Sequence, residues 1–239
     1  MTEPTSALTV PSDADPLPDV VQMLFAAGDL FSPTAWVRWV LDQVCDFDPI
    51  GDVAKWFSGD WNRLMQASRG LTNLGEYHAL LGEELDVARR AVSADWDGTA
   101  AQAADTYFRT LVAALDDQRS ALSNIAGQYQ AVAVGMSQAA ELAAGLLSSM
   151  VDWVLIAAAS AAAAAASSWT VVGGLVGGGA TAAAILRAAD LARQIVAAHA
   201  MAVSLANGAV ASTAGFLGAI HGFSGAALPS AYDHPGATR

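Results

Sequence analysis

Four histidines are the side chains best suited to metal or acid–base chemistry in this sequence: His78, His199, His221 and His234. A zinc site on one helix needs two ligands on the same face, as in a pair four residues apart, and no two of these histidines have that spacing. The single cysteine, Cys45, gives neither an internal disulfide nor a Cys-x-x-Cys metal motif. The spacing therefore favours structural histidines, with His78 on an apolar stripe.

Other catalytic patterns are also missing. Glu83-Glu84 and Asp116-Asp117 are adjacent pairs, which a helix turns about 100° apart, so we interpret them as solvated faces. The run GGLVGGG at 173–179 is not a dinucleotide fingerprint, and the sequence holds no GxxxxGK[ST] or GxSxG motif. We expect a protein that is not an enzyme and carries no cofactor.

Charge is low and unevenly distributed. Charged residues make up 14% of the 239 residues, against about 25% in typical soluble domains. Residues 1–150 hold 20 Asp and Glu against 8 Lys and Arg, a net charge of −12, whereas residues 151–239 hold 3 of each. The only lysine is Lys55. Without a basic patch, nucleic-acid binding is not expected.

The first 18 residues are acidic, carry prolines at 4, 11, 16 and 18, and predict a disordered tail. They lack the basic and apolar regions of a secretory signal peptide, so export would require a different route. Residues 19–30 and 34–45 then predict two short helices, followed by a break at Asp46–Gly51.

Helical spacing dominates the next hundred residues. Apolar or small residues recur at steps of three and four from Phe57 to Val92, although Gly70, Gly75 and Gly82 weaken this pattern locally. From residue 104 a stripe continues for about seven heptads without a slip. This heptad stripe comprises Ala104, Phe108, Leu111, Leu115, Gln118, Leu122, Ile125, Tyr129, Val132, Met136, Ala139, Ala143, Leu146 and Met150.

A helix of about 50 residues is about 75 Å long and needs a partner helix to cover its apolar side. We expect the two helices to form an antiparallel hairpin whose turn is Trp96-Asp97-Gly98. Gly98 would supply a positive φ, Asp95 or Asp97 would cap the second helix, and Trp96 would cover the gap at the end of the pair.

This segment, SADWDGTAAQAADTYF at 93–108, resembles the WXG-type substrates of type VII (ESX) secretion systems, in which a Trp-x-Gly turn joins two helices. The resemblance covers about residues 52–150: Trp96 and Gly98 match the motif, and Phe108, Leu111 and Leu115 match the apolar pattern after it. The greater length is similar to that of longer actinobacterial ESX-associated secreted proteins, or of the amino-terminal carrier part of a toxin.

The resemblance implies a protein that is made in the cytoplasm and then secreted, or placed in the cell envelope, through the type VII machinery. It also implies pairing with a helical WXG-type partner, and a homo-oligomer is the alternative. Such systems use a Tyr-x-x-x-Asp/Glu signal after the hairpin, but Tyr129 is followed at that distance by Ala133. A partner would therefore carry the signal.

The last third of the chain is rich in Ala and Gly. Residues 153–186 contain no charged side chain, which satisfies the length criterion for a membrane span, but alanine contributes little insertion energy. The glycines Gly173, Gly174, Gly177 and Gly178 permit close helix packing, and Trp153 and Trp169 would either mark membrane interfaces or fill gaps. A soluble bundle is favoured, with a membrane-inserting or pore-forming module at 153–223 as the alternative.

The sequence thus predicts an all-α protein with four regions. These are a tail at 1–18, a hairpin domain with two leading helices at 19–150, an Ala/Gly-rich helical region at 151–225 and a polar tail at 226–239.

Overall fold

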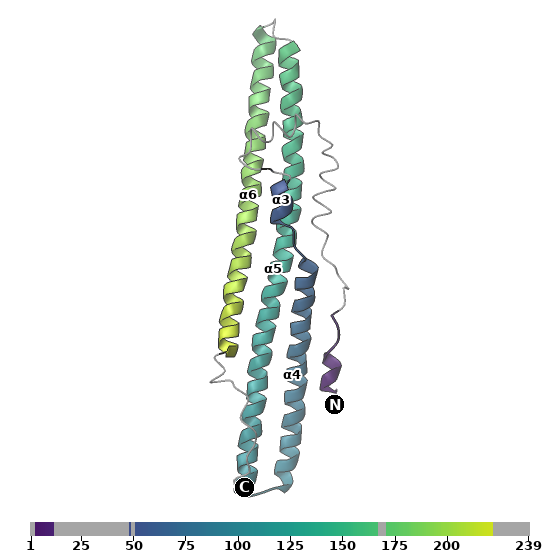
Figure 1. Cartoon of the computed structure of the whole chain (residues 1–239), viewed down its shortest axis with the longest axis vertical. Coiled ribbons are helices and arrows are strands. Elements are labelled where there is room, and N and C mark those ends of the chain that lie inside the picture. Colours follow the sequence, from purple (N-terminus) through teal and green to yellow (C-terminus); the bar gives the residue numbers. More distant parts are fainter. Residues whose placement is uncertain (1–2, 12–47, 49–50, 167–170, 222–239) are drawn as a thin grey trace. The chain divides into compact units, whose positions relative to one another are not determined.

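The computed structural model describes residues 3–11, 48, 51–166 and 171–221. Within these ranges nearly every residue is helical and there is no strand, so the predicted all-α class is confirmed. The predicted leading helices at 19–30 and 34–45, and the polar tail at 226–239, lie outside the described residues. The described elements are η1 (Pro4–Ala7), α3 (Gly51–Trp56), α4 (Trp61–Asp95), α5 (Thr99–Ala166) and α6 (Val171–His221) (Figure 1).

Contacts divide the chain into two compact units. Unit 1 contains 1–15, 62–133 and 207–239, and unit 2 contains 16–61 and 134–206. Both α5 and α6 contribute to each unit. α5 continues through residue 150, where the sequence suggested a boundary between regions, without interruption.

In unit 1, α4 packs antiparallel to the first half of α5. Residues that meet across the two helices pair in reverse order, because Ser68 contacts Ala126 and Arg89 contacts Asp105. The Ser68 hydroxyl donates a 2.7 Å hydrogen bond to the Ala126 carbonyl, so the one buried polar side chain on α4 is satisfied.

Small residues spaced seven apart form the buried side of α4: Ser68, Gly75 and Gly82. A Cβ on Gly75 would lie 3.6 Å from the Arg119 carbonyl oxygen, and one on Gly82 would lie 3.9 Å from Val112. Two of the three glycines that weaken the apolar pattern in the sequence, Gly75 and Gly82, therefore lie directly against α5.

Residues 3–11, which the proline content predicts to be disordered, are ordered against α4. Asn73 donates a 2.9 Å hydrogen bond to the Thr9 carbonyl, Pro11 lies beside Gly70, and Pro4 and Ala7 are buried. Proline fixes φ and so lowers the entropy cost of ordering a segment that has partners to pack against.

In unit 2, α3 begins with a reciprocal cap. Gly51 donates a 3.0 Å bond from its backbone N–H to the Asp48 carboxylate, and the Asp48 N–H donates to the Asp52 carboxylate at 3.2 Å. α3 therefore begins at Gly51, the last residue of the predicted break, and the carboxylates of Asp48 and Asp52 cap its start. Val53 and Phe57 are fully buried, and they anchor α3.

The second half of α5 packs antiparallel to α6 in unit 2. The Ser160 hydroxyl is 3.0 Å from that of Thr181, and Leu205 lies against Gly135. The buried side of α6 steps by four and three through Ala184, Ala188, Leu191, Ile195, Ala198 and Ala202. Alanine at most of these positions leaves room for the two helices to pack closely.

Candidate functional site

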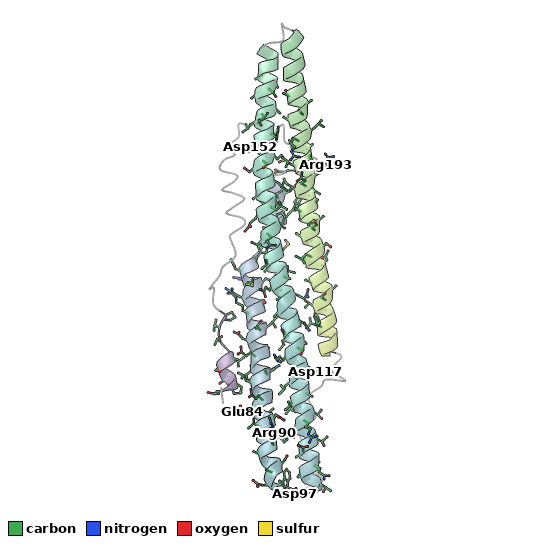
Figure 2. The ribbon with its side chains drawn as sticks, turned by 180° about the vertical axis from the view of Figure 1, so that it is seen from behind. Glu84, Arg90, Asp97, Asp117, Asp152 and Arg193 are labelled. Carbon is green, nitrogen blue, oxygen red and sulfur yellow. The ribbon has the colours of Figure 1, made fainter. Side chains whose placement is uncertain are left out.

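The turn between α4 and α5 is the site with the most distinctive backbone. Gly98 has φ +102°, the only positive φ among the described residues, and its carbonyl accepts the first helical bond from Gln102 at 3.1 Å. Gly98 itself is thus the N-cap of α5, a position that the sequence suggested for Asp95 or Asp97. Asp97 still lies beside the N-terminus of α5, where the helix dipole favours a negative charge. Figure 2 shows Asp97 at this end of the helix pair.

Trp96 is the first residue of the turn and is not fully covered, since 39% of its surface is exposed. Beside it, α4 and α5 enclose a mainly apolar cavity of about 210 Å³. Its lining includes Leu85, Ala88, Val92, Trp96, Ala101, Ala104 and Phe108. Val92 is 53% exposed at the rim. The helices therefore separate here and leave a small apolar hollow with an aromatic ring at its edge.

Next to this cavity, Arg89 links the two helices electrostatically. Its guanidinium donates to Asp86 on α4 and to Asp105 on α5, and Asp105 also pairs with Arg109. The hydrogen bond from Arg89 lowers the pKa of Asp86, and the bond to Asp86, followed by that to Asp105, raises the pKa of Arg89. The ion pair between Arg89 and Asp105 joins α4 to α5 in this register.

A second hollow of about 480 Å³ lies between α4 and α5 near His78. Its titratable lining residues are His78, Glu83, Asp86, Arg109, Asp116 and Arg119. Burial lowers the pKa of His78, whose Nδ1 is buried without a hydrogen-bond partner. Among the described residues no three His, Cys, Asp or Glu side chains gather closely enough to hold a metal ion.

Two more histidines lie on α6: His199, and His221 at its last residue. The contacts of His199 are well defined. Its ring stacks on Trp56 with centroids 4.4 Å apart and 16° between the planes, and it meets Phe57 edge-on at 6.0 Å. This packing holds α3 against α6 in unit 2, a structural role. His234 lies outside the described residues.

Every position of the heptad stripe is buried or partly buried. Leu115, Ile125 and Met136 are buried, whereas Phe108, Leu111, Leu122, Tyr129 and Val132 are partly covered. The stripe on α4 differs from expectation, because its large residues flank the buried line of small ones. Leu74 is 36% exposed, one position before the buried Gly75.

Gly173, Gly174, Gly177 and Gly178 lie in the helical backbone of α6, and Trp153 is partly buried on α5. Trp169 lies outside the described residues. Two helical segments, Thr99–Ala162 and Gly179–Gly218, are long and apolar enough to cross a membrane. In Gly179–Gly218, only 22% of the most apolar stretch is buried, a low share for the core helix of a soluble protein. Length and composition alone make this weak evidence.

The sequence patterns did not predict that Gly75, Gly82 and the Arg89–Asp105 ion pair form contacts between α4 and α5. The seven-residue spacing of Ser68, Gly75 and Gly82 is a signal that could have found the close approach. The ion pair depends on the register between the two helices, which only their packing reveals.

Comparisons with known proteins add no relative: no protein-family model, no curated protein and no solved structure matched this chain.

Proposed function

We propose that this chain is a non-enzymatic substrate of a type VII secretion system, and that α4, the Trp96-Asp97-Gly98 turn and α5 form the WXG-type hairpin through which it pairs with a helical partner. The resemblance of residues 52–150 motivates the proposal. The observation that carries it is the half-exposed Trp96 ring at the edge of an apolar cavity, beside the positive φ of Gly98.

The exposed residues of α4 support a partner helix. Leu74 and Val92 on α4, and Trp96 just after its end, are separated by multiples of about one helical turn and remain partly exposed. An amphipathic helix from a partner would bury these side chains. Aromatic residues such as Trp contribute disproportionately to such interfaces.

Export gives the direct test. In the native host, deletion of the type VII ATPase should leave the protein in the cells and abolish its appearance in the medium. Export that continues unchanged in the deletion strain rules out the proposed route.

Recognition of Trp96 is tested separately. Trp96→Ala should lower export strongly while the thermal midpoint changes little, since the ring is partly exposed, and Trp96→Phe should restore part of the export. Leu142→Ala is the control, because Leu142 is an exposed apolar residue of α5 that lies outside the proposed partner surface and far from the turn. Equal export of Trp96→Ala and wild type would exclude Trp96 as a recognition element.

A further inference from the structure

The end of unit 2 beyond Asp152 and Arg187 is a pair of helices without charge. On α5, residues 153–166 carry no ionisable side chain, and on α6 the same holds for 171–186. The Ser160–Thr181 contact brings these two stretches together. Counted back from this contact along the antiparallel helices, Asp152 on α5 lies opposite Ala189 on α6 and hence beside Asp190.

Beyond Asp152 on α5 and Arg187 on α6, towards the end of the helix pair, neither helix carries a charged residue. Asp190 accepts hydrogen bonds from Arg187 and Gln194, both at 2.9 Å, and lies 3.6 Å from Arg193. Together with Asp152 they form a charged collar, defined here as Asp152, Arg187, Asp190 and Arg193. Figure 2 shows Asp152 on α5 and Arg193 on α6 within it. The collar carries two charges of each sign and is therefore neutral overall.

Beyond the collar, the two helices touch only along one narrow line. Val154, Ala157 and Ala184 are buried there, and most other described side chains face outward. The exposed residues on the described part of this end are Leu155, Ile156, Ala159, Ala161, Ala162, Gly179, Ala180, Ala182, Ala183, Ile185 and Leu186. Apolar surface thus surrounds the pair and is not confined to one stripe.

A single apolar stripe is typical of a helix that packs against another protein helix. Apolar side chains on all sides are instead typical of a helix whose surroundings are themselves apolar. The two hydroxyl groups in the described part of this end, on Ser160 and Thr181, have hydrogen-bond partners. The Ser160 hydroxyl is hydrogen-bonded to Thr181 and, at 2.8 Å, to the Ile156 carbonyl. Helical backbone satisfies its own hydrogen bonds, which is the condition for entering hydrocarbon.

We propose that this charge-free end of unit 2 inserts into a lipid bilayer, with the charged collar at the level of the headgroups. Trp153, partly buried directly after Asp152, lies at the depth where the amphipathic indole is favoured. At about 1.5 Å per residue, residues 153–166 extend about 21 Å, less than the roughly 30 Å hydrocarbon core. The end therefore enters the membrane without the length to cross it. This proposal does not depend on the export route.

The insertion is tested with a single reporter. In a Cys45→Ser background of the full chain, Ala162→Cys carries an environment-sensitive fluorophore. Met201→Cys is the matched control, because Met201 is 70% exposed and lies on α6 on the other side of the collar from the charge-free end. With phosphatidylcholine vesicles, the label at 162 should shift to shorter wavelength and be quenched by nitroxides on the acyl chains. The label at 201 should stay in water. No shift at 162, or equal shifts at both positions, overturns the proposal.

Charged substitutions give a second readout that does not depend on the label. Ala162→Glu and Ala182→Glu replace exposed residues, so both variants should keep the helical circular dichroism of the wild type. Each should weaken partitioning into phosphatidylcholine vesicles by at least about tenfold. Leu142→Glu, exposed on α5 before the collar, should leave partitioning unchanged.

The competing occupant is a second copy of the chain. In that case the label at 162 would shift as protein concentration rises without lipid, and the mass in solution would double. That result, with no further shift on addition of vesicles, also overturns the proposal.

Discussion

Gly98 is the residue at which backbone conformation alone has a measurable energetic effect. A Cβ there would meet nothing within 4 Å, yet φ is +102°. Gly98→Ala should therefore destabilise the protein by about 1–2 kcal/mol through strain without any clash. Gly75→Ala is the control, since its Cβ would make ordinary contacts and its helical φ favours alanine by up to about 1 kcal/mol. Urea unfolding measures both, and equal losses would show that packing, and not φ, matters at the turn.

His78 predicts a pH dependence. Because burial lowers its pKa in the folded state, the unfolded chain binds more protons below the ordinary value of about 6.5. The contribution of His78 to the stability of the fold is fully present above about pH 6.5. It is lost as the pH falls from about 6.5 through the pKa of His78 in the folded protein. His78→Gln should reduce the fall in thermal midpoint between neutral pH and mildly acidic pH. A variant with an unchanged fall would assign the pH effect to other groups.

At the scale of elements, the register between α4 and α5 depends on Arg89. Its side chain is largely covered and joins Asp86 to Asp105, whereas Arg90 is mostly exposed and pairs only with Asp86 on its own helix. Arg89→Ala should lower the thermal midpoint clearly more than Arg90→Ala, because it leaves two carboxylates without their shared cation.

The same change has a spectroscopic signature. Loss of the Arg89 hydrogen bond should raise the pKa of Asp86 towards its ordinary value, as measured by carboxyl NMR titration. In the wild type, Asp86 stabilises the fold above its unfolded pKa, and that contribution is lost as pH falls below about 4. An unshifted Asp86 in Arg89→Ala would contradict the assigned cause.

At the scale of the molecule, two units share the helices α5 and α6. Phe57, fully buried in unit 2, packs on His199. Phe57→Ala should cost about 3–5 kcal/mol by leaving a cavity. If each unit opens cooperatively, amide hydrogen exchange should accelerate in residues 134–206 far more than in 62–133. Uniform acceleration along α5 would mean that the long helix couples the two units into one.

By itself, the sequence determined the helical class, because apolar residues recur at the helical period over most of the described chain. It also determined the charge-free stretch between Asp152 and Arg187. It did not determine the centre of the buried side of α5, since Ala133, Ala140 and Leu147, each one position after the stripe, are almost fully buried.

Only the tertiary structure decided which side of α4 is buried. The pattern of residues in the sequence identifies large apolar side chains, but two helices can pack closely where side chains are small. Gly75 and Gly82 are therefore buried in the interface with α5, whereas Leu74 lies at its edge. The Arg89–Asp105 pair and the order of residues 3–11 likewise depend on contacts between segments distant in sequence. Local pattern specifies helices, whereas the register between them is a property of packing.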